Sequence, residues 1–128
     1  MNYFYEPVNL TQWNLFEKVK HEGHIEPFLA TKAMHCGDRV LLHVGKQVPE
    51  YESGVYAVGE IVTEPYILRN SPQDYCNNKN TVDVRIVKLQ RGEPYIDHDI
   101  CAEFIHQFRT VHKIDPSNYA MIESLLPR

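Results

Sequence analysis

The chain has 128 residues, of which 43% are hydrophobic and 23% are charged, an ordinary composition for a globular protein. This length suits a single hydrophobic core, so we predict one domain over residues 1–128. The sequence has no run of 18 or more apolar residues, and we therefore expect no contact with a membrane interior. The net charge of −4 gives no overall basic field of the kind that draws most nucleic-acid binders to phosphate.

Cysteine usage and the first residues bear on the cellular compartment. Cys36, Cys76 and Cys101 are odd in number and widely separated, which argues against a disulfide framework and favours a reducing environment. Residues 1–7 lack a positive region followed by an apolar stretch, so they do not resemble a secretory signal. We expect a cytoplasmic protein.

The first elements are a short strand and a helix. Residues 3–5 form an aromatic strand that Pro7 is expected to end. Asn9 is a candidate helix N-cap, with Gln12 in the capping-box position and Gly23 as the stop. The apolar residues of the expected helix recur every three positions along one face: Leu10, Trp13, Phe16 and Val19.

The middle of the chain predicts a β-hairpin. After a weaker helical stretch over residues 27–34, a Gly37-Asp38 turn leads into an apolar strand over residues 39–44. A polar loop then separates it from a second strand over residues 55–62. Gly59 inside that second strand predicts a bulge or a close backbone approach.

The next strand shows clean alternation. Residues 67–80 are loop-like, and residues 82–86 then alternate between apolar and charged side chains. Val87 and Leu89 fall on the opposite face, which predicts a bulge near Ile86-Val87.

The C-terminal part predicts a helix over residues 99–108, a strand over residues 110–114, and a last helix that begins at Asp115-Pro116. The apolar residues expected to bury this last helix are Tyr119, Ile122, Leu125 and Leu126. Strands grouped in the middle with helices near the two ends favour an α+β fold around a curled, mainly antiparallel sheet.

The order and spacing of these pieces resembles the EVE domain family of the PUA-like superfamily, over roughly residues 28–126. The pieces that carry the resemblance are residues 33–38, 41–43, 54–62, 64–66, 71–72 and 82–89. The resemblance implies a PUA-like, mixed but mainly antiparallel β-barrel flanked by short helices, related to YTH and ASCH domains. It also implies recognition of a modified base, with methylated or hydroxymethylated cytosine in DNA favoured over RNA. The base would be flipped into a pocket of aromatic and polar groups.

The resemblance places the pocket around His43, which lies where the family often carries a strand histidine. Nuclease-linked members of the family usually have a Trp shortly before the Gly-Asp pair; here His24 or Phe28 would replace it. Trp13 itself lies on the apolar stripe of the first helix, which favours core packing. The expected pocket residues are Tyr5, His24, Phe28, His43, Val44, Gly45 and Tyr66, and the expected phosphate contacts are Lys46, Arg69 and Lys79.

Other functions remain open at this point. A small hydrolase or ribonuclease of the ASCH type is the alternative if Lys46, His43 and Glu60 converge, and a protein-interaction module is a third possibility. The spacing of His98, Cys101 and His106 is loosely ligand-like, but on a helix these side chains would not share one face, so we expect no metal and no cofactor. The expected partner is nucleic acid, with a separately encoded nuclease or NTPase as a further candidate.

Overall fold

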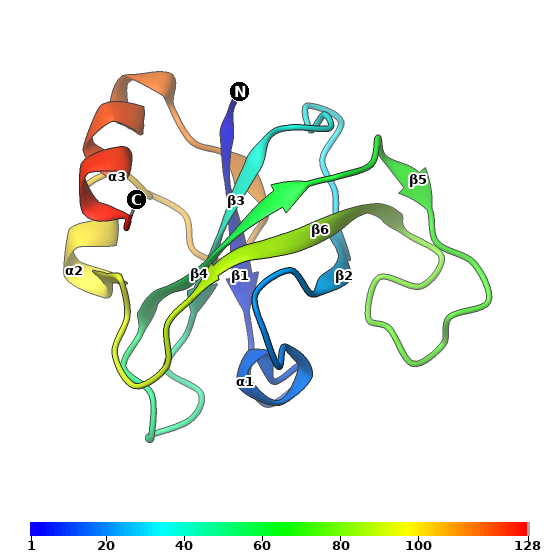
Figure 1. The fold of residues 1–128 in the computed structure, drawn as a ribbon, viewed down its shortest axis with the longest axis horizontal. Helices are drawn as coiled ribbons and strands as arrows, with labels where there is room; N and C mark the ends of the chain where they lie inside the picture. Colours follow the sequence, from blue (N-terminus) through cyan, green and yellow to red (C-terminus); the bar gives the residue numbers. More distant parts are fainter. Residues whose placement is uncertain (128) are drawn as a thin grey trace.

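The computed structural model describes residues 1–127, which contain one curled sheet in the strand order β2-β6-β4-β3-β1-β8. The strands are β1 (Tyr3–Val8), β2 (Ile25–Leu29), β3 (Arg39–Val44), β4 (Gly54–Ile61), β5 (Tyr66–Ile67), β6 (Asn80–Leu89), β7 (Ile96–Asp97) and β8 (His112–Lys113). The helices are α1 (Leu15–Lys18), α2 (His98–Cys101), a 3-10 turn η1 (Pro116–Asn118) and α3 (Tyr119–Leu125). All strand pairs are antiparallel except β1 with β3 (Figure 1). The predicted fold class, α+β with a mainly antiparallel barrel-like sheet flanked by short helices, is confirmed, although the sheet curls into a half-barrel and does not close.

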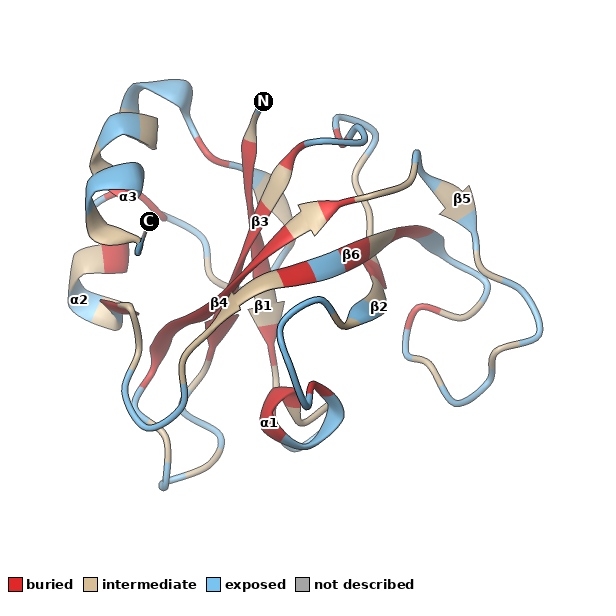
Figure 2. Cartoon of the chain, viewed as in Figure 1, coloured by how far each residue is buried: buried red, intermediate tan, exposed pale blue. Residues whose placement is uncertain are grey.

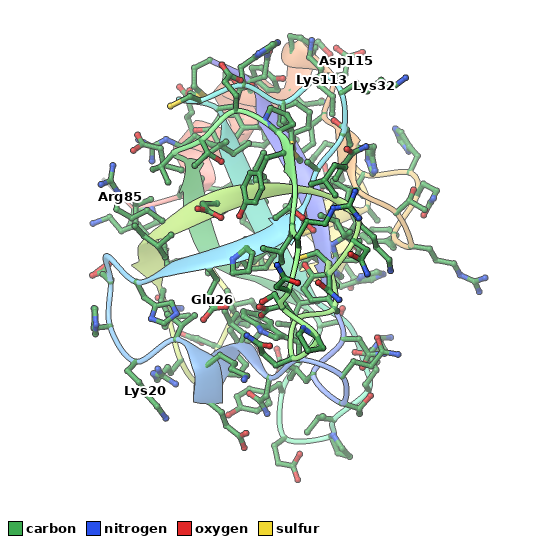
Figure 3. All side chains as sticks on the ribbon, turned by 90° about the vertical axis from the view of Figure 1, so that its right-hand side faces the viewer. Lys20, Glu26, Lys32, Arg85, Lys113 and Asp115 are labelled. Atoms are coloured by element: carbon green, nitrogen blue, oxygen red, sulfur yellow. The ribbon has the colours of Figure 1, made fainter. Side chains whose placement is uncertain are left out.

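The central hairpin and its bulge follow the sequence prediction. Strands β3 and β4 pair antiparallel, and β6 pairs with the other side of β4. Val58 lies opposite Lys88 while Gly59 lies opposite Ile86, so Val87 is the extra residue of the predicted bulge. A Cβ atom on Gly59 would lie 2.1 Å from a side-chain carbon of β6, which explains the glycine. Arg85, an outward-facing residue of this strand, projects away from the sheet (Figure 3).

The sheet separates two hydrophobic clusters, because neighbouring residues on a strand point to opposite faces. Phe4 belongs to the cluster on the side of α1, together with Leu15 and Phe16. Tyr5 belongs to the cluster under α2 and α3, together with Phe104 and Ile122. Figure 2 shows the buried strands running between the α1 side and the α2–α3 side. The sheet is therefore covered on both faces at its centre.

The first helix is shorter than predicted. Residues 9–13 form turns around Asn9, and α1 begins only after Asn14, whose side chain accepts hydrogen bonds from two backbone N–H groups of α1. An asparagine in the middle of a helical pattern competes with the helix for these groups, which accounts for the late start. The apolar stripe is still buried at Leu10, Phe16 and Val19.

Two further boundaries were predicted wrongly. The helical prediction for residues 27–34 is wrong, because residues 25–29 form β2, which pairs antiparallel with β6. Pro7 does not end the first strand, since β1 continues to Val8 beside β3. Both Pro7 and Pro27 lie in strands with an unpaired edge, where a missing N–H group is tolerated.

The C-terminal elements are shorter than predicted, but the start of the last helical segment at Asp115 was predicted correctly. Helix α2 covers residues 98–101 rather than 99–108, and β8 covers only two residues of the predicted strand. Asp115 caps the turn that precedes α3 and accepts a hydrogen bond from the Ser117 N–H, which confirms the predicted helix start.

The sheet is open along one seam. Strands β2 and β8 are its two edges, and β8 pairs only with Phe4 and Tyr5 of β1. The second half of β1, residues 6–8, therefore has no strand partner on the side away from β3. Cavities lined by both β1 and β2 lie along this seam. Within residues 1–127, no helix has the length and hydropathy of a membrane span.

Candidate binding site

A cavity of about 660 Å³ lies in the open seam. Its lining comes from β1, the turns before α1, β2, the loop after β3, helix α2 and the segment before β8. The residues that line it are Tyr5, Pro7, Val8, Asn9, Gln12, Trp13, Phe28, Leu29, His43, Gly45, Lys46, Gln47, Ser53, Tyr75, His98, Phe108 and Arg109. Residues distant in the sequence thus meet where the sheet fails to close.

Rings form much of the cavity wall. The ring of Trp13 stands edge-on to that of Phe28, with 5.2 Å between the centroids. On the α2 side, the ring of Phe108 lies 4.6 Å from His98 and 5.1 Å from His43. Such walls present π faces to a flat ligand.

A hydrogen-bonded chain of three side chains crosses the buried end of the cavity. The Tyr5 hydroxyl donates to the carbonyl of Phe108 at 2.7 Å, so its oxygen is left to accept from His43 Nδ1, 3.3 Å away. His43 Nε2 then carries the lone pair and faces His98 Nδ1 at 3.4 Å. These contacts assign both imidazoles the Nδ1–H tautomer. His98 Nε2 is then an acceptor.

Burial keeps Tyr5 and His43 uncharged. Desolvation, reinforced by the neighbouring His98, lowers the pKa of His43 from 6.5 to about 4. Desolvation also raises the pKa of the Tyr5 hydroxyl above its ordinary value. At neutral pH the buried end of the cavity is polar but uncharged at both residues, which suits a neutral polar ring better than a phosphate.

The rim of the cavity carries the cations. Lys46 follows β3 on the loop after Gly45, and Arg109 follows Phe108; both side chains are exposed. A ligand with a ring and a negatively charged group would meet uncharged groups inside and positive charge outside.

Four of the predicted pocket residues meet in this cavity: Tyr5, Phe28, His43 and Gly45. Lys46, a predicted phosphate contact, lies beside them. They come from three separate segments that the fold brings together.

Two predicted pocket residues on or near the strands lie elsewhere. Val44 is buried in the cluster on the α1 side, and its carbonyl accepts a hydrogen bond from the Ser53 hydroxyl. His24 precedes β2, and its Nε2 lies 2.6 Å from a carboxylate oxygen of Glu26. Neither lines the cavity.

The predicted residues of the β5–β6 region are also separate from it. Tyr66 donates its hydroxyl to the carboxylate of Asp83. Arg69 donates to the side chain of Asn78, while Lys79 lines a second cavity farther along the seam.

The grouping required for a hydrolase does not form. Glu60 is bound to Arg85, with 2.6 Å between carboxylate oxygen and guanidinium nitrogen, and it does not line the cavity that contains His43 and Lys46. Among residues 1–127, His98, Cys101 and His106 do not come together as a group that could hold a metal ion, and no other three His, Cys, Asp or Glu side chains do so.

Several lining residues were not predicted from the sequence. Trp13, which the helical spacing assigned to the core, does pack against the cluster on the α1 side, but it is only half-buried and also lines the cavity. The signal that could have corrected this is Asn14, a cap residue directly after it. His98 was weighed only as a metal ligand, Phe108 was placed at the end of a helix, and Arg109 fell between two predicted elements. No local pattern indicates that these three residues line a cavity beside β1.

No family model matches this chain, and no curated protein matches it by sequence. Its structure resembles a hypothetical protein from Leishmania major, at 17% identity and TM-score 0.69, over 98% of this chain and 94% of the other. It also resembles a Pseudomonas syringae protein, at 14% identity and TM-score 0.68, over 96% and 98% of the two chains. A Rhodopseudomonas palustris protein is similar at 15% identity and TM-score 0.64, over 98% and 92%. At these identities the likeness shows a shared fold.

Proposed function

We propose that this chain is a non-catalytic reader of a modified nucleobase, which it takes, flipped out of its strand, into the seam cavity. The expected base is methylated or hydroxymethylated cytosine in DNA. The observation that carries the proposal is the combination of ring walls with the hydrogen-bonded side chains of Tyr5, His43 and His98 at the buried end of the cavity.

The size and walls of the cavity support this proposal. Its volume of about 660 Å³ lies within the usual range for small-molecule sites. A flipped base offers a flat face to rings such as Trp13, Phe28 and Phe108, and stacking of this kind contributes about 1–3 kcal/mol per base. His98 Nε2, as an acceptor, suits the amino group on the edge of cytosine.

The charge distribution sets the expected mode of binding. Lys46 and Arg109 are the cations placed to meet a phosphate at the rim. The chain as a whole carries a net charge of −4, so general attraction to the backbone is weak. Most of the affinity must then come from the base in the cavity, and binding should discriminate strongly among bases.

Trp13 makes the proposal directly testable, since it is the only tryptophan and lines the cavity. We expect its fluorescence to be quenched by short DNA strands that contain 5-methyl- or 5-hydroxymethylcytosine, more than by unmodified or RNA strands. His43→Ala should abolish this preference. His106→Ala, which replaces an exposed histidine outside the cavity, should retain it.

Three outcomes are informative. Absence of binding to every oligonucleotide at low salt would refute the proposal. Equal binding of modified and unmodified strands would refute modified-base recognition. Metal-independent cleavage of RNA by the wild type would favour the hydrolase alternative.

A further inference from the structure

A second cavity, of about 410 Å³, adjoins the first along the seam. The two share Pro7, Leu29, Tyr75 and Arg109 in their linings. The remaining lining residues of the second cavity are Glu6, Ala30, Thr31, Lys79, Asn80, Thr110 and Val111. A ligand that extends beyond the first cavity would enter this one.

Glu6 is the unusual group of the second cavity. Its side chain is only 1% exposed, and the structure of residues 1–127 contains no cation paired with it. Its Oε2 atom is buried without a hydrogen-bond partner, and it is the single such side-chain atom in the described part of the chain. Buried polar atoms are almost always paired, so an unpaired atom beside a cavity calls for a hydrogen-bond donor from outside the chain.

Protonation alone does not satisfy this carboxyl group. Burial raises the pKa of Glu6 well above its usual value, and the Tyr75 hydroxyl beside it opposes that shift. A neutral acid would still leave one oxygen, now a hydroxyl, without a partner, and an unmade buried hydrogen bond destabilises the fold. A hydrogen-bond donor from a ligand would remove the defect and would favour the ionised form.

Positively charged side chains line the mouth of the second cavity. Lys79 and Arg109 line it, and both are exposed. Since Arg109 lines both cavities, it lies where a phosphate between two neighbouring nucleotides would pass. The second cavity therefore suits a nucleotide with a hydrogen-bond donor on its base.

We propose, on the basis of the function proposed above, that the second cavity binds the base next to the flipped one, and that Glu6 Oε2 accepts a hydrogen bond from its exocyclic amino group. The chain then reads a modified base together with an amino-bearing neighbour, such as cytosine, rather than uracil or thymine. Glu6 sets this specificity while the first cavity holds the modified base.

The test uses single strands that carry one 5-methylcytosine and differ only in its neighbours, which are cytosine in one strand and uracil in the other. We expect the wild type to bind the cytosine-flanked strand about tenfold more tightly, as for loss of a hydrogen bond to a charged group. This preference should grow as pH rises, because the amino group binds ionised Glu6. Trp13 fluorescence reports binding of both strands.

Glu6→Gln provides the reciprocal measurement. Its amide offers a neutral oxygen acceptor and N–H donors. The preference should therefore weaken, because the bond to the cytosine amino group loses its charge and the N–H donors can bind the carbonyl of uracil instead. Affinity for the 5-methylcytosine itself should remain. Glu26→Gln, a half-buried glutamate outside both cavities, is the matched control and should keep the wild-type preference.

The outcomes separate this inference from the function on which it rests. If the wild type binds the modified base equally with either neighbour, or prefers uracil, the second site is refuted and the reader function stands. If no strand binds, both are refuted. Should Glu6→Gln fail to fold by circular dichroism, the comparison of neighbours on the wild type decides alone.

Discussion

The two cavities of the seam share Tyr75 and Arg109 but differ at their buried ends. The first ends in rings and a chain of neutral hydrogen bonds through Tyr5 and His43. The second ends in a single carboxyl group, Glu6, with an unpaired oxygen. The buried polar groups of the first cavity, Tyr5 and His43, thus have hydrogen-bond partners within the chain, whereas Glu6 Oε2 in the second cavity has none.

The difference has a simple origin in β1. Tyr5 and Glu6 are consecutive residues, so the strand directs them to opposite faces. Because β8 stops pairing with β1 after Tyr5, both faces of the strand reach the seam there. One unpaired half-strand therefore supplies two neighbouring cavities with unlike chemistry. Variants that affect one cavity and not the other test this separation.

The largest expected effect concerns the stability that neutral His43 provides. Its pKa is 6.5 when unfolded and about 4 when folded, so the unfolded chain takes up a proton first as pH falls. Stability from this group is complete above pH 6.5 and declines by about 3 kcal/mol as pH falls toward 4. Urea unfolding of His43→Gln at several pH values should show a flatter decline than wild type.

His106→Gln is the control for that series, because His106 is exposed and should leave the slope unchanged. If the stability of His43→Gln depends on pH as steeply as that of wild type, His43 takes up its proton equally in the folded and unfolded states. His43 would then not be held neutral in the first cavity.

The next effect concerns the ring wall. Trp13→Ala should weaken binding of the modified strand by about tenfold to a hundredfold, since it removes one stacking face. Anisotropy of a labelled strand measures this, because the variant lacks tryptophan. Tyr95→Ala removes a half-buried aromatic side chain outside both cavities and should leave affinity unchanged. Equal losses in the two variants would mean that Trp13 acts through the fold alone.

Local signals made the centre of the fold predictable. The hairpin followed from two apolar strands with a turn before them, and the bulge followed from Gly59 and the change of face at Val87. In these places the sequence pattern and the tertiary structure impose the same requirement. The same local pattern placed His43 on a regular strand, whereas its assignment to a pocket came only from the family resemblance.

Elements that depend on a distant partner could not be predicted. Residues 25–29 form a strand because β6, more than fifty positions away, offers them an edge. Apolar residues that recur every three positions fit a series of turns as well as a helix. This ambiguity is why the place of Trp13 in the cavity wall was not predicted. Glu6 and His98 line cavities only because distant segments of the chain meet at the seam, and no local sequence pattern indicates that meeting.

The unpaired carboxyl group of Glu6 should destabilise the folded state increasingly as pH rises. The folded pKa of Glu6 is raised above 4.5, so its contribution is complete below that value and is lost as pH rises through the folded pKa. Glu6→Gln cannot ionise, and its melting temperature should exceed that of wild type at pH 8, with a smaller difference at pH 4. An unchanged difference across this range would indicate that water already solvates the carboxylate.

The smallest expected effect is a change in affinity on substitution of Arg109, which lines both cavities. Arg109→Ala should weaken binding several-fold and reduce the salt dependence of affinity by about one counterion, because a single phosphate contact is lost. Arg69→Ala removes the same charge from the β5–β6 loop, outside both cavities, and should change neither quantity. Both variants lower the net charge equally, so a difference between them measures position alone. If the two arginines prove equivalent, the strand does not cross the boundary between the cavities, and the two sites would bind separate ligands.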